Sequence, residues 1–144
     1  MKKIATTLAA AILMITSFSA FAAEENNPLK DVKSEKIIST YLEATTLGSI
    51  DLNTFLFAED FEYRNNSNKD VFSKTEYLQF LKTQKGLVYD CKTSYELLDQ
   101  SGQTCLAKAT MTFENFTRVD YITLNQGKDG WKVSEVITTY ANPE

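Results

Sequence analysis

The part of the chain that decides the fold is residues 113–140, which read FENFTRVDYITLNQGKDGWKVSEVITTY. Apolar and aromatic side chains recur at about every second position on both sides of Lys128-Asp129-Gly130. A period of two is typical of β-strands with one buried face, and an Asp-Gly pair favours a turn. The stretch therefore predicts two long strands, residues 116–125 and 131–140, joined by a tight turn.

Two further strands are predicted immediately upstream. Residues 87–98 and 103–114 also alternate apolar with polar positions, and the segment between them, Asp99 to Gly102, has the composition of a turn. One face of each strand is therefore expected to be buried, and the opposite, polar face is expected to lie in solvent.

The first half of the chain favours helices. A polar and flexible lead-in, residues 23–30, precedes residues 31–47, whose apolar side chains fall at helical spacing. A shorter helix is expected from Asp51. A third is expected from Ser73, because Glu76 stands three residues later, as in a capping box.

The order of these elements predicts the fold class. Between the second and third helices, residues 61–64 form a short strand candidate and residues 65–70 an exposed turn. Helices followed by a run of antiparallel strands define an α+β fold. The length suits a single core, so residues 31–144 are expected to form one domain.

The N-terminus has the pattern of a secretory signal peptide. Lys2 and Lys3 precede an uncharged run, residues 4–21, and Ala20-Phe21-Ala22 places small residues where a signal peptidase cleaves. The run is also long enough for a membrane anchor, but the Ala-x-Ala end and the acidic residues after it favour cleavage. The sequence predicts a signal peptide at residues 1–22 and an exported protein, periplasmic or secreted.

Composition excludes several function classes. Without Lys2 and Lys3 the basic residues fall from 15 to 13 against 19 acidic ones, a net charge of −6. This balance disfavours nucleic acid and, after signal cleavage, a membrane as partners. The chain has no histidine, so it lacks the commonest zinc ligand and the base of Ser-His-Asp and Cys-His sites. No metal and no cofactor are expected.

The two cysteines, Cys91 and Cys105, are predicted to be buried free thiols. An exported protein favours a disulfide. Both cysteines lie on the apolar faces of neighbouring strands, however, roughly 13–20 Å apart along the predicted hairpin at ~3.3 Å per residue. A disulfide needs Cα atoms within about 7 Å of each other.

Two segments resemble the nuclear-transport-factor-2-like superfamily. The first is YLEATTLGSIDLNTFLFAEDFEY, residues 41–63, a long helix and a short one that runs into Phe-Ala-x-Asp-Phe. The second is VDYITLNQGKDGWKV, residues 119–133, a strand that ends in an Asp-Gly-Trp-Lys turn. The most similar members are small bacterial exported proteins labelled "putative lumazine-binding-like" and ketosteroid-isomerase-like proteins.

The resemblance implies a strongly curved antiparallel sheet wrapped around about three N-terminal helices as a cone. The cone would hold an internal pocket, and the protein would be a homodimer. The superfamily includes enzymes, binding proteins and assembly domains, so the fold alone does not specify a reaction.

Asp120 is the first candidate for a functional residue. It shares a strand face with Ile122 and Leu124, so it is expected to point into the cone, where burial would raise the pKa of its carboxyl and suit it to act as a base. Two alternatives stay open. Arg118 on the same face would hold Asp120 in an ordinary surface ion pair, or the faces are reversed and Asp120 lies in water.

Glu135 is the second candidate, because it shares its strand face with Trp131 and Val133. Tyrosines on the predicted strands would supply phenol donors near the carboxylates, and the tryptophan is expected to plug one end of the cone. The predicted pocket residues are Tyr63, Tyr89, Tyr95, Asp120, Trp131 and Glu135.

Three functions are compatible with these features. The sequence favours an exported domain that binds a small, mostly apolar ligand without catalysis, because the predicted interior is aromatic with few convergent polar groups. The second is an assembly or dimerisation module with a filled cone. The third is an isomerase-like or cyclase-like enzyme that uses Asp120 or Glu135 as general base.

Overall fold

The computed structural model describes residues 26–141, and the predicted signal peptide lies outside these residues. The helices do not include one that is long and apolar enough to cross a bilayer, as far as the described residues go. In chain order the elements are α1 (Ser34–Thr46), α2 (Asn53–Leu56), β1 (Phe57–Asn65), β2 (Val71–Ser73), α3 (Lys74–Thr83), β3 (Lys92–Ser101), β4 (Thr104–Thr112), β5 (Thr117–Gly127) and β6 (Gly130–Ala141).

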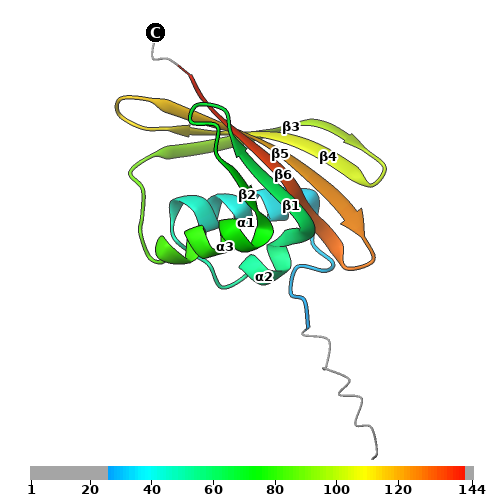
Figure 1. Cartoon of the computed structure of the whole chain (residues 1–144). Coiled ribbons are helices and arrows are strands. Elements are labelled where there is room, and N and C mark those ends of the chain that lie inside the picture. Colours follow the sequence, from blue (N-terminus) through cyan, green and yellow to red (C-terminus); the bar gives the residue numbers. More distant parts are fainter. Residues whose placement is uncertain (1–25, 142–144) are drawn as a thin grey trace, which may run out of the picture.

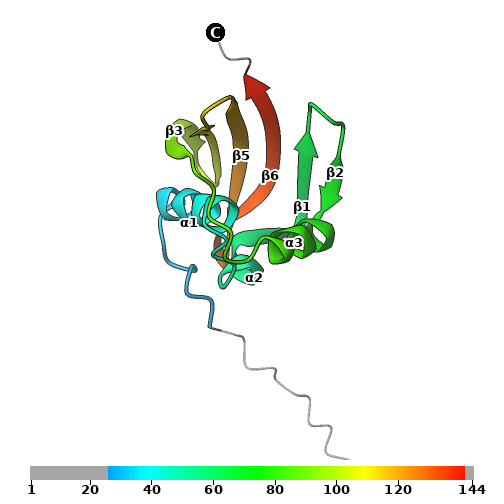
Figure 2. The same cartoon turned by 90° about the vertical axis from the view of Figure 1, so that its left-hand side faces the viewer.

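The strands form one six-stranded sheet in the order β2-β1-β6-β5-β4-β3. Neighbouring strands are antiparallel except for β1 and β6, which run parallel. The sheet is curved and the helices lie on one side of it (Figures 1 and 2). The predicted α+β class and curved sheet are therefore confirmed.

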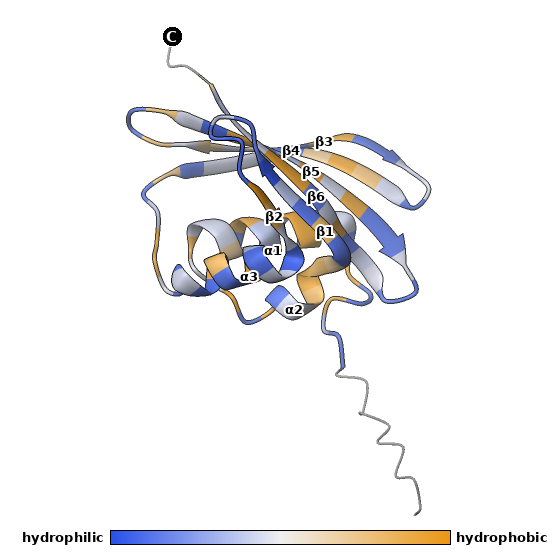
Figure 3. Cartoon of the chain, in the orientation of Figure 1, coloured by the Kyte–Doolittle hydropathy of each residue, from blue (hydrophilic) through white to orange (hydrophobic). Residues whose placement is uncertain are grey.

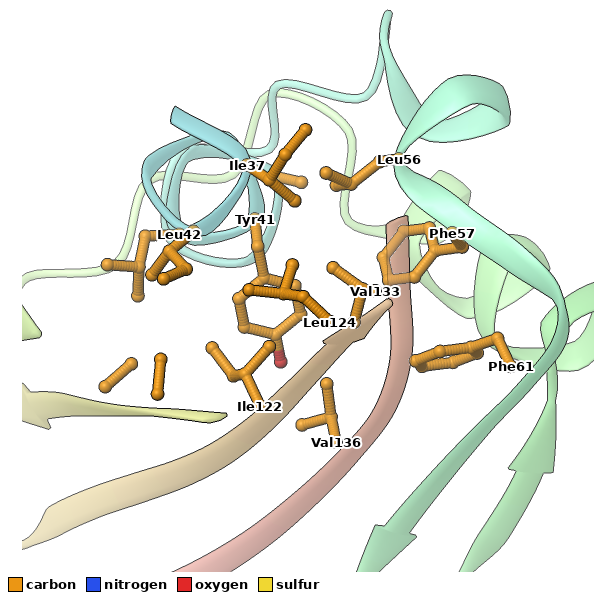
Figure 4. Packing of buried hydrophobic residues seen from close by; sticks show 14 of the residues in the cluster. Ile37, Tyr41, Leu42, Leu56, Phe57, Phe61, Ile122, Leu124, Val133 and Val136 are labelled. Carbon is orange, nitrogen blue, oxygen red and sulfur yellow. The ribbon is translucent and has the colours of Figure 1, made fainter. Parts of the chain in front are cut away.

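The core lies between α1 and the inner face of β4, β5 and β6. Tyr41 of α1 points toward Ile122 of β5 and Val136 of β6, Ile37 lies on the side of α1 nearest Leu56, and all of these side chains are completely buried (Figure 4). Phe57 at the start of β1 packs edge-on against Tyr41, with ring centroids 6.3 Å apart. The helical spacing of apolar residues in α1 is thus the spacing of its core contacts.

The third helix begins as its sequence predicts. The backbone N–H of Glu76 donates to Ser73 Oγ at 3.3 Å, and the backbone N–H of Ser73 donates to Glu76 Oε1 at 3.2 Å, which is a complete capping box. The first helix differs from expectation, because its N-cap is Lys33 and no side chain caps it. The helix therefore begins three residues later than the start of the predicted range, residues 31–47.

The lead-in before α1 packs against the β5–β6 hairpin and is not a loose tail where the structure describes it. Leu29 is buried in the core cluster, and Asn27 Nδ2 donates to the backbone carbonyl of Asp129 at 3.0 Å. Gly130 has φ +95°, and a Cβ there would meet the backbone of Lys30. Glycine is required at this turn by its conformation and by the close approach.

Three strands, β1, β2 and β3, differ from the prediction. β1 runs over nine residues where only residues 61–64 were expected, and β2 was not predicted at all. β3 begins at Lys92, later than predicted. Each is a position where pairing with a neighbouring strand, which the local sequence does not encode, sets the length.

Both cysteines are free thiols, as predicted. Cys105 is fully buried and Cys91 is half-buried. Burial raises the pKa of both thiols, so the reactive thiolate is disfavoured at each.

Candidate functional site

Asp120 is the centre of a buried polar cluster on the inner face of β5. Its side chain is completely buried, which resolves the open question about its direction. Oδ1 accepts hydrogen bonds from Arg118 Nε at 2.9 Å and Thr138 Oγ1 at 2.7 Å. Oδ2 accepts from Arg118 Nη2 at 2.9 Å and Tyr41 Oη at 2.6 Å. The cluster thus joins α1, β5 and β6.

These four bonds decide what Asp120 can do. A carboxylate offers about four lone-pair positions, and every one of them is directed at a protein donor. A base must accept a proton from the reacting molecule at hydrogen-bonding distance. Asp120 therefore holds its neighbours in place and presents no free oxygen to a ligand.

Among Asp120, Arg118, Thr138 and Tyr41, only Arg118 lines the pocket of about 210 Å³ that lies beside the cluster. Its side chain is 16% exposed, and its hydrogen bonds use Nε and Nη2. Nη2 also donates to Thr138 Oγ1 at 3.4 Å. Nη1 has no hydrogen-bond partner among residues 26–141, so it is the free donor of a guanidinium whose plane is fixed by Asp120.

The charge of Arg118 is fixed as firmly as its position. Burial acts to lower the pKa of the guanidinium, but the charge of Asp120, with smaller effects of Tyr41 and Tyr77, outweighs it and holds the pKa above its ordinary value. Arg118 and Asp120 together carry no net charge. The cluster therefore offers hydrogen-bond donors without a strong attraction for anions.

Two tyrosine hydroxyls connect this cluster to α3. Tyr41 Oη lies 3.4 Å from Tyr77 Oη, and both rings are buried. Burial raises the pKa of both hydroxyls, and the charge of Asp120 raises each further. Both tyrosines are therefore neutral hydrogen-bonding groups.

A pocket of about 210 Å³ lies above Arg118. Four of the lining rings are nearly parallel and contact one another in a closed set: Tyr63 stacks on Tyr77 (4.6 Å, 12°) and on Phe72 (5.8 Å, 12°), and Phe80 contacts both Phe72 (6.4 Å, 16°) and Tyr77 (6.2 Å, 24°). The lining residues are Tyr63, Asn65, Asn68, Asp70, Phe72, Tyr77, Phe80, Arg118 and Tyr140.

Tyr140 adds a fifth ring to the lining of the pocket and belongs to a second aromatic group. Tyr140 packs against Phe116 at 5.9 Å, and Phe116 stacks on Phe113 at 4.4 Å and 15°. Two of the lining rings are half-exposed, Tyr140 at 42% and Phe80 at 45%. Large apolar rings are thus exposed at the mouth of the pocket, where a ligand would cover them.

Glu135 is not part of this site. The β5–β6 pairing shifts register between Thr123 and Leu124, because Ser134 is an extra residue in β6. This bulge reverses the alternation after Val133, so Glu135 lies on the outer face, in a shallow groove with Glu62 and Thr123. The expected inward direction of Glu135 is therefore wrong, since a bulge cannot be read from a period of two.

The other predicted pocket residues lie in three different places. Tyr63 lines the pocket above Arg118. Tyr89 and Tyr95 line a separate cleft of about 520 Å³ between α1 and β3. Trp131 is buried near the hairpin turn, in the core cluster and away from both pockets. The structure thus brings together only Tyr63 and Asp120 of the six.

Three residues in or next to the cluster were not recognised as site residues from the sequence. Tyr41 and Tyr77 occupy apolar stripes of helices and look like ordinary core positions. Thr138 is the direct cross-strand neighbour of Asp120 in the β5–β6 pairing. If residues are paired one by one outward from the hairpin turn, the bulge in β6 shifts the register, so a different residue is placed opposite Asp120.

The residues that the structure describes include no group of three or more metal-binding side chains. The site therefore combines a neutral pair of charged residues, Arg118 and Asp120, which supplies hydrogen-bond donors, with a lining of aromatic side chains.

The chain belongs to the family described as "Putative lumazine-binding", whose model matches residues 30–138. Its fold is that of NTF2-like and cystatin-like proteins. No curated protein sequence matches the chain.

Solved structures show the same fold at low sequence identity. An NTF2-like protein of unknown function from Silicibacter pomeroyi is 11% identical, with a TM-score of 0.62 over 74% of this chain and 92% of that one. A cystatin-like fold protein from Burkholderia xenovorans is 11% identical, with a TM-score of 0.63 over 76% and 90%. An NTF2-like protein from Cytophaga hutchinsonii is 14% identical, with a TM-score of 0.58 over 76% and 100%.

Proposed function

We propose that this protein binds a small, planar, uncharged ligand in the pocket above Arg118. The observation that carries the proposal is that Arg118, whose Nη1 has no hydrogen-bond partner among residues 26–141, lines a pocket together with five aromatic side chains. The ring of the ligand would lie beside the aromatic side chains, and a carbonyl or ring-nitrogen acceptor on its edge would receive a hydrogen bond from Nη1.

The size and charge of the pocket support this ligand class. Pockets for drug-sized ligands are about 300–1,000 Å³, and this one is about 210 Å³, so a ligand of one or two fused rings is the better fit. Asp120 neutralises Arg118, and Asp70 stands among the lining residues. An anionic ligand would find no net positive charge.

The description of the family, "Putative lumazine-binding", independently supports the same class of ligand. Lumazine is a fused two-ring heteroaromatic whose edge carries carbonyl acceptors. Such a molecule has the shape to stack on the Tyr63 and Phe72 side and the acceptors to reach Arg118. We therefore take lumazine as the probe, without assigning it as the natural ligand.

Binding is favoured over catalysis because Asp120 has no free lone pair and Glu135 lies on the outer face. An isomerase-like or cyclase-like reaction needs a base in contact with the ligand. A filled assembly module is disfavoured by the open pocket and by the exposed rings at its mouth.

The test is isothermal titration calorimetry of lumazine against matched variants. Phe80→Ala and Tyr140→Ala each remove a half-exposed ring from the pocket mouth, and each is expected to weaken binding about tenfold, since an aromatic contact contributes about 0.5–1.5 kcal/mol beyond its buried area. Tyr121→Ala removes a ring of similar exposure from the outer face and should leave affinity unchanged. Absence of binding, or equal effects of all three variants, would contradict the proposal.

Export is proposed on the sequence pattern of residues 1–22 alone. Intact-mass measurement of the protein recovered after secretion should give a chain that begins at residue 23. Recovery of the full-length chain in the membrane fraction would instead indicate an anchor.

A further inference from the structure

The cleft of about 520 Å³ between α1 and β3, here called the α1–β3 cleft, is larger than the pocket above Arg118. Its volume lies within the range of about 300–1,000 Å³ that is typical of sites for small molecules. Small side chains leave room for it, because Tyr95 and Leu97 on the inner face of β3 lie opposite Ala109 and Ala107 of β4. The proposed function makes no use of this cleft.

Hydrogen bonds join α1 to the β3 side of the molecule at both ends of the helix. At its start, Ser34 Oγ donates to Gln100 Oε1 in β3 at 2.7 Å. At its end, the backbone N–H of Tyr89 donates to the backbone carbonyl of Thr46 at 2.8 Å. The ring of Tyr89 is held as well, since its hydroxyl donates to Gln84 Oε1 at 2.7 Å. The cleft is therefore preformed, and a ligand would not have to order its walls.

Tyr95 is an aromatic side chain of this cleft that has no partner of its own kind. It lies on the inner face of β3, opposite the completely buried Ala109, and yet it is 41% exposed. Within residues 26–141 its hydroxyl makes no hydrogen bond and its ring packs against no other aromatic ring. The ring is therefore available to a ligand that enters the cleft.

The charge at the cleft is negative. Among the described residues that line it, Glu43 of α1 is the only charged one, and it is exposed. A second carboxylate acts on the lining residue Cys91, because burial and then the negative charge of Asp90 raise the pKa of its thiol. Arg118 acts on the same thiol in the opposite direction and less strongly, and Asp120 balances its charge. The cleft therefore favours a cation over an anion.

Apolar side chains continue from the cleft onto the neighbouring surface. Leu42 lines the cleft and is buried, and Leu47, one turn further along α1, lines it and is 47% exposed. A Cβ on Gly48 would lie 2.7 Å from the backbone nitrogen of Leu87, so the exposed segment of Leu87 and Val88 runs beside Leu47. Figure 3 shows this apolar stretch in the connection between α3 and β3. An apolar path thus leads out of the cleft.

We propose that the α1–β3 cleft binds an organic cation with an apolar tail. The cationic head would lie beside the Glu43 carboxylate and the Tyr95 ring, and the tail would cover Leu42 and Leu47. A quaternary ammonium group is attracted both by a carboxylate and by the face of an aromatic ring. The guanidinium of Arg118 disfavours a cation in the other pocket, so the two cavities take different ligands. Binding in this cleft does not depend on the proposed function.

The first test is an NMR titration of the whole protein with hexyltrimethylammonium. Glu43→Gln removes the charge at constant size, and Tyr95→Leu removes the aromatic face but keeps an apolar side chain. Each should raise the dissociation constant of this probe about fivefold, as expected for a half-exposed ion pair or cation–π contact. Glu96→Gln and Tyr121→Leu, both on the outer face of the sheet, are the matched controls and should leave the dissociation constant unchanged.

The second test separates the head of the ligand from its tail. Tetramethylammonium lacks the tail and 1-hexanol lacks the charge, so both should bind more weakly than hexyltrimethylammonium, and Glu43→Gln should not affect 1-hexanol. The shift changes caused by hexyltrimethylammonium should cluster at Leu47, Tyr89 and Tyr95. Absence of saturable binding, equal affinity in Glu43→Gln and Tyr95→Leu, or shift changes centred on Tyr63 and Tyr140 would overturn the proposal.

Discussion

Each face of the β5–β6 strand pair carries one carboxylate, and the two carboxylates lie in opposite environments. On the inner face Asp120 is completely buried and accepts four hydrogen bonds. On the outer face Glu135 lies in an open groove beside Glu62 and Ser134. The two residues are close in the ladder, since Thr138 faces Asp120 and Glu135 faces Thr123.

The difference shows that a buried carboxylate, once its hydrogen bonds are satisfied, can hold a functional side chain in place. Asp120 alone would be costly inside the core, and its donors remove that cost. In return it fixes Arg118 at the base of the pocket, and the function proposed here depends on that guanidinium. Glu135 is solvated, and no residue of the pocket depends on it. Four experiments test the difference between Asp120 and Glu135.

The largest effect is expected from Asp120→Ala. The substitution leaves Arg118 largely buried without its counter-charge and removes the acceptor of Tyr41 and Thr138. Breaking such a pair costs about 3–5 kcal/mol of unfolding free energy. Urea denaturation followed by circular dichroism measures the loss, and a loss below about 1 kcal/mol would show that the cluster is not a structural centre.

Tyr41→Phe is expected to cost less, about 1–3 kcal/mol, because it removes one donor from buried Oδ2 and keeps the ring. Tyr121→Phe on the outer face is the matched control and should change stability by less than about 0.5 kcal/mol. The same denaturation assay compares the two. Equal losses in both variants would mean that the inner hydroxyl has no special role.

Alkaline pH should lower the free energy of unfolding because the inner face contains buried tyrosine hydroxyls. The hydroxyls of Tyr41 and Tyr77 have pKa values raised above the ordinary 10.0. Below pH 10 they are protonated in both states and their contribution is intact. Above pH 10 the unfolded chain loses these protons while the folded chain retains them, so stability falls by about 1.4 kcal/mol per pH unit for each tyrosine until the folded pKa is reached.

The measurement is unfolding free energy at pH 9, 10 and 11 for the native chain and for Tyr77→Phe. The variant should lose less stability than the native chain over this range. A slope that is the same in both would mean that Tyr77 ionises as easily in the folded chain as in the unfolded one.

Glu135→Gln is expected to have the smallest effect, within about 0.5 kcal/mol, as for other surface substitutions away from special features. It should also leave lumazine affinity unchanged. A loss of binding comparable to that of Phe80→Ala would return Glu135 to the list of site residues.

Much of this contrast can be predicted from the sequence, because alternation along β5 places Asp120 and Arg118 on one face with Ile122. The capping box at Ser73 and the turn at Gly130 are equally local. These features depend on side chains a few residues apart, which the sequence displays directly.

The rest depends on contacts between distant segments. The bulge at Ser134 places Glu135 on the outer face, and no local sequence pattern indicates that β6 contains an extra residue there. Tyr41 and Tyr77 belong to the site because α1 and α3 cross the same part of the sheet. β2 is a strand because β1 pairs with it, although its three residues carry little strand signal of their own.

The most direct test of the central claim is a two-dimensional NMR titration of the isotopically labelled protein with lumazine. We expect the chemical-shift changes to cluster at Tyr63, Tyr77, Tyr140 and the Arg118 Nε–H, while the signals of Tyr89, Tyr95 and Glu135 stay unchanged. Changes centred on Tyr89 and Tyr95 would place binding in the cleft beside β3, and either that outcome or an unchanged spectrum would show that the pocket above Arg118 does not bind lumazine.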